Sequence, residues 1–150
     1  MVKLQIGNIL NIDRGFIFHQ VNTDGVMGGL AGQIKHKWPV EVLNYIEACR
    51  NYQLSVGEYI TSNINDGLTI VHIAGQIHPG ANTDLKAVEK AFNQFRIDYR
   101  GDLSQEYFPY MMGCGMGGGN WDEYFELIEI YFPDAIIVAR QEDLDRYGYK

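Results

Sequence analysis

Two glycine-rich segments carry the residues whose types and spacing could do chemistry. The first runs from His19 to Ala31 (HQVNTDGVMGGLA) and the second from Pro109 to Trp121 (PYMMGCGMGGGNW). Each segment is typical of a strand end, a loop and a helix start. Glycines let a backbone approach a ligand closely, and the free N–H groups at a helix N-terminus favour a phosphate. The two segments therefore predict a site for a phosphate-bearing ligand.

The second segment fits the common phosphate-binding motifs only in part. Gly113, Gly115 and Gly118 satisfy the G-x-G-x-x-G pattern of dinucleotide-binding domains. That pattern opens a βαβ unit with an acidic residue about twenty residues later, whereas here we expect one helix and one strand after it. A P-loop needs Lys and then Ser or Thr where this chain has Gly119 and Asn120, and a cysteine phosphatase loop needs Arg at position 120.

Cysteine and metal chemistry are not expected. Cys114 has no cationic neighbour that would favour a thiolate, so we interpret it as a small loop residue. Histidine, cysteine and acidic residues do not occur at recognised metal-ligand spacings, so we predict no metal and no cofactor. The chain has only Cys49 and Cys114 and no export signal, which indicates the reducing cytoplasm.

Composition indicates one globular domain over residues 1–150. A chain of 150 residues can bury a core without metal or disulfide staples, and its hydrophobic fraction of 46% is that of a packed protein. The net charge of −7 argues against broad nucleic-acid binding through many phosphate contacts. No apolar run is long enough to cross a bilayer, so we expect no membrane insertion.

The elements that must position the two segments follow from hydropathy and turn signals. The triplet Asn65-Asp66-Gly67 favours a tight turn between two strands, and Thr83 or Asp84 can cap a helix. Strands alternating with helices predict an α/β fold with a mixed, mostly parallel sheet covered on both faces, and ligands beyond the strand ends. We expect strands over 2–6, 16–21, 59–62, 69–74, 107–112 and 135–139, and helices over 28–38, 40–50, 84–96, 122–131 and 141–147.

Taken together, the segments resemble the macro domain family. Residues 22–39 (NTDGVMGGLAGQIKHKWP) resemble its first ligand loop and helix, especially in the branch of DNA ADP-ribosyl glycohydrolase antitoxins and small ADP-ribose-1″-phosphate phosphatases. Residues 108–121 (FPYMMGCGMGGGNW) resemble its diphosphate loop, and residues 6–10 (IGNIL) resemble its adenine-side turn. The resemblance extends to about Ala139 and implies a three-layer αβα macro domain.

The resemblance also implies where a ligand lies. The adenine is expected near Asn8 and Ile9, although many members have Asp where Asn8 stands, and the distal ribose is expected near Asn22. Arg140 is expected against the adenine, where relatives often place an aromatic residue. The other expected ligand contacts, mainly to the diphosphate between the two loops, are Gly25, Val26, Met27, Gly28, Gly29, Ala31, Gln76, Gly113, Cys114, Gly115, Met116, Gly117, Gly118, Gly119 and Asn120.

Two catalytic patterns of the family can be compared with this chain. Members of the branch that use a lysine carry it after the strand matched by 70–74, with an Asp in the diphosphate loop. This chain has Gly75-Gln76-Ile77-His78 and Gly117-Gly118-Gly119 at those places. Phosphatase-like members have a His before the first loop, matched by His19. His19 or Asp24 is therefore expected to be an acid or base in catalysis.

The sequence leaves three functions open. The leading hypothesis is binding of ADP-ribose or a derivative with hydrolysis of ADP-ribose-1″-phosphate. One alternative is a non-catalytic reader or sequestering protein for ADP-ribose or NAD-derived nucleotides, and another is a hydrolase acting on ADP-ribosylated DNA or protein. The expected partner is a small molecule, with an ADP-ribosylated macromolecule as the alternative. His19 itself could equally be a hydrogen-bonded histidine at a strand end, and His78 is a second titratable candidate.

Overall fold

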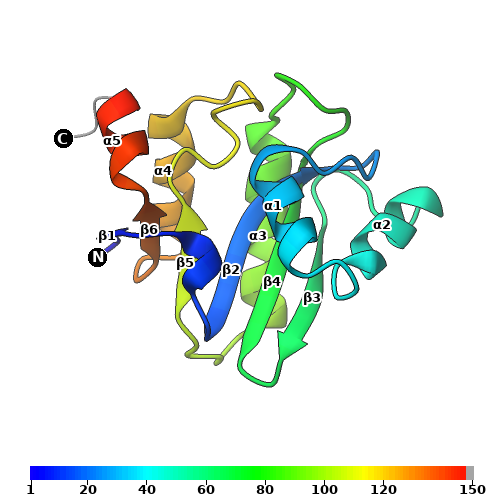
Figure 1. Cartoon of the computed structure of the whole chain (residues 1–150), viewed down its shortest axis with the longest axis horizontal. Coiled ribbons are helices and arrows are strands. Elements are labelled where there is room, and N and C mark those ends of the chain that lie inside the picture. The colour runs from blue at the N-terminus through cyan, green and yellow to red at the C-terminus, as the bar shows by residue number, and fades with distance from the viewer. Residues whose placement is uncertain (148–150) are drawn as a thin grey trace.

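A six-stranded sheet forms the middle layer of the structure, a computed structural model that describes residues 1–147 (Figure 1). The strand order is β1-β6-β5-β2-β4-β3, and every neighbouring pair is parallel except β3–β4. This confirms the mixed, mostly parallel sheet. The strands are β1 (Lys3–Ile6), β2 (Gly15–Asn22), β3 (Tyr59–Asn65), β4 (Leu68–Gln76), β5 (Glu106–Pro109) and β6 (Ile136–Ala139).

Helices cover both faces of the sheet and complete the expected αβα layers. Helices α1 (Gly29–Lys37) and α2 (Leu43–Arg50) lie on the face nearer the viewer in Figure 1, and α3 (Leu85–Asp98) and α4 (Trp121–Tyr131) lie behind it. A short 3-10 helix, η1 (Ile9–Asn11), joins β1 to β2, and α5 (Gln141–Tyr147) follows β6. No helix in residues 1–147 is long and apolar enough to span a bilayer.

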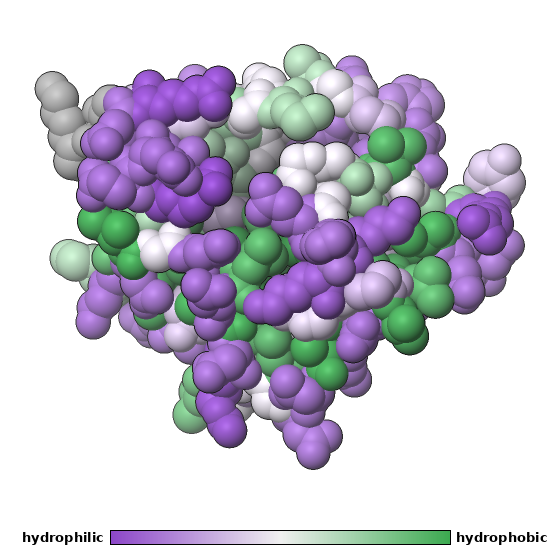
Figure 2. Space-filling model, viewed as in Figure 1, coloured by the Kyte–Doolittle hydropathy of each residue, from purple (hydrophilic) through white to green (hydrophobic). Residues whose placement is uncertain are grey.

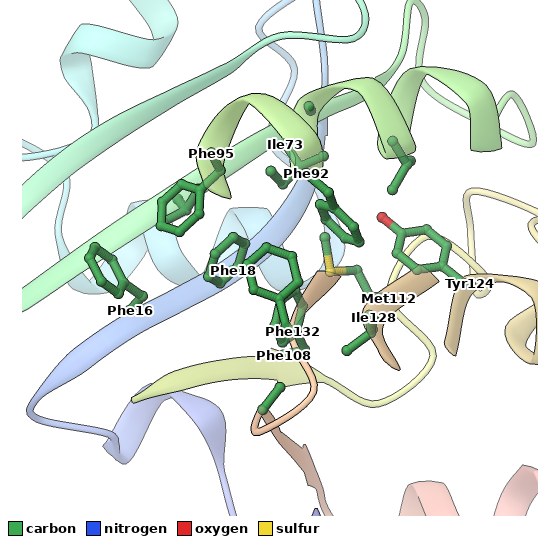
Figure 3. Packing of buried hydrophobic residues seen from close by; sticks show 14 of the residues in the cluster. Phe16, Phe18, Ile73, Phe92, Phe95, Phe108, Met112, Tyr124, Ile128 and Phe132 are labelled. Carbon is green, nitrogen blue, oxygen red and sulfur yellow. The ribbon is translucent and has the colours of Figure 1, made fainter. Parts of the chain in front are cut away.

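Strand β2 contributes side chains to the hydrophobic core on both faces of the sheet, because its side chains point alternately to one face and the other. Phe16 and Phe18 point toward α3 and α4, whereas Ile17 packs with residues of α1. On the α3–α4 side the core is largely aromatic (Figure 3). The ring of Phe18 stacks on Phe108 at a centroid distance of 4.3 Å and meets Phe132 edge-on at 5.0 Å. Offset and edge-to-face contacts of this kind add to the burial of apolar area.

Most predicted elements are confirmed, and three boundaries differ by three residues. The strand expected over 59–62 continues to Asn65. The strand expected over 107–112 ends at Pro109, because Met111 has a φ of +62° and Met112 N–H turns back to the Pro109 carbonyl. The helix expected over 40–50 begins at Leu43, after a turn in which Val42 N–H bonds the Trp38 carbonyl. The hairpin turn between β3 and β4 is confirmed by their antiparallel pairing.

The Phe18→Ala substitution should lower the free energy of unfolding by about 3–5 kcal/mol, because it opens a cavity between the sheet and α3–α4. Urea unfolding followed by circular dichroism measures this loss. Tyr52→Ala is the matched control, because Tyr52 is 94% exposed and its removal leaves the core intact. Equal unfolding free energies for the two variants would contradict the packing in Figure 3.

Candidate functional site

A cleft of about 290 Å³ opens where the carboxyl ends of β2, β4 and β5 meet the two glycine-rich loops. Ligands of open α/β sheets bind beyond these strand ends. On the face shown in Figure 2, the surface above α1 is white to pale green, which marks residues of intermediate hydropathy. The region over α5 is purple and therefore hydrophilic. The cleft is lined by His19, Gln20, Val21, Asn22, Val26, Gly28, Gly29, Leu30, Ala31, Gln76, Pro79, Gly80, Pro109, Tyr110, Met111, Met112, Gly113, Gly115, Met116 and Gly117.

The N-terminus of α1 forms one wall of the cleft and has no side-chain cap. Gly28 is the N-cap residue, and the first turn has no acidic residue, whereas the last turn holds Lys35, His36 and Lys37. The first N–H groups of a helix have no partner within the helix and carry the positive end of its dipole. A Cβ at Gly28 would meet nothing within 4 Å, and its φ is −116°, so packing does not require glycine there. The missing side chain instead leaves these N–H groups open to the cleft.

The second loop faces α1 across the cleft and owes several of its glycines to packing. A Cβ at Gly117 would lie 2.6 Å from the Thr83 hydroxyl, and one at Gly118 would lie 2.7 Å from the Ala81 side chain. Gly118 also has a φ of +71°. Substitutions at these positions would push the loop away from residues 81–83. The glycine pattern over 113–118, which we interpreted as a phosphate-binding motif, thus also reflects close contact between this loop and residues 81–83.

A partly buried polar network links the carboxyl ends of β2 and β4 to the second glycine-rich loop. The Gln20 side-chain amide donates to Gln76 Oε1 at 2.8 Å and to Thr83 Oγ at 2.7 Å, and its oxygen accepts from the Tyr124 hydroxyl at 2.9 Å. Thr83 in turn donates to the Gly113 carbonyl at 2.7 Å. Gln20 and Thr83 were missed as site residues. A glutamine inside an otherwise apolar strand was the available signal.

Asn22 shapes the first loop. Its Oδ1 accepts from the N–H groups of Asp24 at 3.1 Å and Val26 at 3.2 Å, and its Nδ2 donates to the Val26 carbonyl at 2.8 Å. Val26 is thereby turned toward the cleft, which both residues line. These bonds occupy one of the two amide N–H groups of Asn22, and its contact with a distal ribose remains a prediction.

Asp24 and His78 form a hydrogen-bonded pair beside the cleft. Asp24 Oδ2 lies 2.8 Å from His78 Nδ1, and the side chains are 40% and 69% exposed. Thr23 N–H bonds the Ile77 carbonyl at 3.0 Å and joins the same two loops through the backbone. Unlike His19, both side chains have access to water.

His19 lies on the cleft floor but is only 1% exposed. Its Nε2 is 2.6 Å from Nδ1 of His72, which is fully buried. Burial lowers the pKa of His19 to about 3, and burial together with the charge of His19 lowers the pKa of His72 well below its ordinary value. Both rings are therefore neutral near pH 7. This environment favours the structural interpretation of His19 over a proton-donating role.

Several predicted ligand residues do not line the cleft. Asn8 caps η1, with Oδ1 accepting from Leu10 N–H at 3.0 Å, and Ile9 is buried in the core beside α1. Arg140 forms ion pairs at 3.1 and 3.2 Å with acidic residues in the first turn of α5. Their contacts with an adenine remain predictions. The others outside the lining are Asp24, Gly25, Met27, Cys114, Gly118, Gly119 and Asn120.

Nucleophile and metal chemistry have little support in this site. Burial raises the pKa of the Cys114 thiol to about 12, so the thiolate is rare at neutral pH. Asn120 is engaged as the N-cap of α4, where its side chain accepts from Glu123 N–H. Within residues 1–147, no group of three or more His, Cys, Asp or Glu side chains is placed to hold a metal ion.

Solved structures share this arrangement of layers. A protein of unknown function from Bacteroides thetaiotaomicron matches with a TM-score of 0.82 at 19% identity, covering 93% of this chain and 98% of that one. The macrodomain of Thermus aquaticus DarG matches with a TM-score of 0.78 at 22% identity, covering 94% and 98%. The chain has the macrodomain fold. Thermosipho africanus DarTG, solved in complex with ADP-ribose, matches this chain with a TM-score of 0.77 at 21% identity, over 93% of this chain and 42% of that one.

Sequence comparison finds two relatives, and no family model matches. The DNA ADP-ribosyl glycohydrolases of Mycobacterium bovis and Mycobacterium tuberculosis are each 24% identical to this chain over 128 residues. The match covers 82% of this chain and 36% of each relative. The chain thus spans little more than a third of the length of these relatives.

The buried histidines should make the folded chain less stable in acid. The unfolded chain binds a proton at His19 below about pH 6.5, whereas the folded chain does not until about pH 3, so this stability is present above pH 6.5 and is lost as the pH falls. Between pH 7 and pH 5 we expect His19 alone to remove roughly 2 kcal/mol of unfolding free energy, at about 1.4 kcal/mol per pKa unit. His72 acts in the same direction.

Urea unfolding at pH 5, 6 and 7 measures this slope. The His19→Leu/His72→Leu double variant should have a shallower slope than the parent, because both titrating groups are gone. His36→Gln changes an exposed histidine of α1 and should retain the parent slope. A double variant as sensitive to acid as the parent would show that the pair does not cause the loss.

Proposed function

We propose that this macrodomain binds ADP-ribose or a close derivative in the cleft between α1 and the second glycine-rich loop. The observation that carries the proposal is the uncapped N-terminus of α1, which opens onto the cleft at Gly28 and Gly29. Helix N-termini of this kind bind phosphate groups through N–H donors and the helix dipole. The ADP-ribose complex of the similar Thermosipho africanus protein supports the choice of ligand.

The charge distribution supports recognition of phosphate by the main chain. The net charge of the chain is −7, and none of the described residues that line the cleft is Lys or Arg. A diphosphate in this cleft therefore depends on backbone N–H groups for positive potential. This arrangement disfavours long anionic polymers and favours one short anionic group that fits between the loops.

The cleft accommodates part of the proposed ligand and points to where the rest lies. Its volume of about 290 Å³ is at the lower end of the range for small-molecule sites. We place the diphosphate and the distal ribose in it, with the ribose near Asn22. The adenine then extends toward Asn8 and Arg140, which lie at the same end of the paired strands β1 and β6.

Gly28→Glu should abolish measurable ADP-ribose binding, because it places a carboxylate in front of the N–H groups of α1. Gly28→Ala should weaken binding at least tenfold, about 1.4 kcal/mol, by keeping the phosphate away from the backbone. Calorimetry measures both affinities. Lys35→Ala, at the other end of the same helix, is the control and should bind like the parent. Parent-like affinity in the folded Gly28→Glu protein would refute the site.

Hydrolysis of the bound ligand is the second candidate function, and the Asp24–His78 pair favours it. With Nδ1–H donated to Asp24, His78 keeps a basic Nε2 that can take a proton from water. In ADP-ribose-1″-phosphate, that water would attack phosphorus, the bond between phosphorus and the C1″ oxygen would break, and the departing oxygen would take up a proton. Exposure makes this pair a better acid–base candidate than His19.

Two other outcomes remain open under the same binding proposal. The mycobacterial relatives are named DNA ADP-ribosyl glycohydrolases, which supports cleavage of ADP-ribose from modified DNA or protein as an alternative reaction. The position at which lysine-dependent members carry their lysine holds Gln76-Ile77-His78 in this chain, so that reaction would also fall to His78 and Asp24. A binder without turnover would act as a reader or sequestering protein.

Asp24→Asn and His78→Gln should each lower phosphate release from ADP-ribose-1″-phosphate by about a hundredfold or more, the usual contribution of a general acid or base. ADP-ribose affinity should change little, because neither side chain lines the cleft. Release of ADP-ribose from modified DNA is measured in parallel, with His36→Gln as the control. Tight binding with neither product would identify a reader, and unchanged rates in both variants would remove the pair from the mechanism.

A further inference from the structure

A chain of hydrogen bonds runs from the cleft floor through three strands to α2. His19 Nε2 on β2 is 2.6 Å from His72 Nδ1 on β4, and His72 Nε2 is 2.8 Å from Ser62 Oγ on β3. Ser62 Oγ is 2.6 Å from Asn44 Oδ1 on α2, and Asn44 Nδ2 is 2.7 Å from the Thr61 carbonyl. The first three side chains are buried and Asn44 is exposed.

The outer end of this chain fixes the direction of every bond in it. The Thr61 carbonyl can only accept, so Asn44 donates through Nδ2 and accepts through Oδ1. The hydroxyl proton of Ser62 is therefore committed to Asn44. The hydroxyl oxygen must then accept from Nε2–H of His72, whose other nitrogen, Nδ1, carries no proton.

The same logic sets the tautomer of His19. Because His72 Nδ1 is an acceptor, His19 donates to it through Nε2–H. Burial disfavours a second proton on the ring, so His19 Nδ1 is a bare acceptor. Among the described residues, this nitrogen is the buried side-chain polar atom that has no hydrogen-bond partner. Leaving a buried acceptor unpaired costs about 1–3 kcal/mol, which calls for an explanation.

We propose that His19 Nδ1 accepts a hydrogen bond from a ribose hydroxyl of the ligand and that the His72–Ser62–Asn44 chain holds it in the acceptor state. His19 lines the cleft, and Nδ1 is its buried and otherwise unpaired polar atom. An unprotonated nitrogen repels a phosphate oxygen that carries no hydrogen, whereas a sugar hydroxyl can donate to it. His19 is thus a specificity residue, because it favours a hydroxyl-bearing part of the ligand over a phosphate at the bottom of the cleft. The inference rests on the proposed binding of ADP-ribose.

Nitrogen NMR of the histidine rings tests the proposal directly. In the free protein, Nδ1 of both His19 and His72 should resonate as unprotonated nitrogens and both Nε2 atoms as protonated ones. Saturation with ADP-ribose should shift His19 Nδ1 in the direction of hydrogen bonding. The backbone amides of residues 28–31 report ligand binding in the same titration.

The amide shifts and the His19 Nδ1 shift distinguish a failure of ligand binding from a failure of the proposed contact with His19. If the amides shift while His19 Nδ1 does not, the ligand binds and the hydroxyl subsite is wrong. If neither shifts, the binding proposal fails and the subsite fails with it. A proton on His19 Nδ1 in the free protein would also overturn the subsite, whatever the ligand does.

A variant distant from the cleft tests the role of the chain. Asn44→Ala removes the acceptor for Ser62, whose hydroxyl can then donate to His72 and reverse the direction of the bonds. We expect a mixture of His19 tautomers and ADP-ribose affinity up to about tenfold weaker, the scale of one hydrogen bond. Asn44→Asp loses the donor to the Thr61 carbonyl but offers oxygens that can only accept, so Ser62 should still donate to it and the parent tautomer should be retained. Parent-like tautomers and affinity in a folded Asn44→Ala protein would show that the chain does not set the acceptor state.

Discussion

The geometry of the cleft depends on one partly buried amide, that of Gln20. It bonds the end of β4, the start of the α3 segment and α4 at once, through Gln76, Thr83 and Tyr124. These bonds are possible because side chains are missing beside them. A Cβ at Gly75 would lie 2.5 Å from Gln20 Oε1, and one at Gly113 would lie 2.6 Å from it. The end of β4 and the second glycine-rich loop can therefore lie this close to Gln20 only because Gly75 and Gly113 have no side chain.

Strand β2 has a different task on each face. On one face, Phe16 and Phe18 build the aromatic core, and Gln20 follows them at the strand end. On the other face, Ile17 packs against α1, and His19 ends the hydrogen-bond chain from α2. A polar residue thus follows a packing residue on both faces, although Val21 beyond His19 returns to an apolar cluster beside α2.

Local patterns were sufficient to predict most of the fold. Three kinds of signal depend only on residues close together in the sequence: the apolar strand segments, the turn at Asn65-Asp66-Gly67 and the helix cap at Asp84. The elements that they predicted were confirmed. The predicted end of β5 was wrong because Met111 adopts a positive φ, which is rare for methionine and cannot be predicted from its residue type. The His19–His72 contact joins residues 53 positions apart, so no local pattern could reveal it. The packing role of Gly117 and Gly118 was hidden for the same reason, since residues 81–83 lie elsewhere in the chain.

The uncapped start of α1 bears on how such a domain changes over time. Main-chain N–H groups are supplied by every residue type except proline, so most substitutions around them leave the donors in place. Substitution can then replace the surrounding side chains while the backbone geometry of this helix start persists. Solved structures with TM-scores of 0.75 to 0.82 have the same fold at only 19–22% identity. The feature that they share with this chain is a backbone shape, which few individual residues reveal.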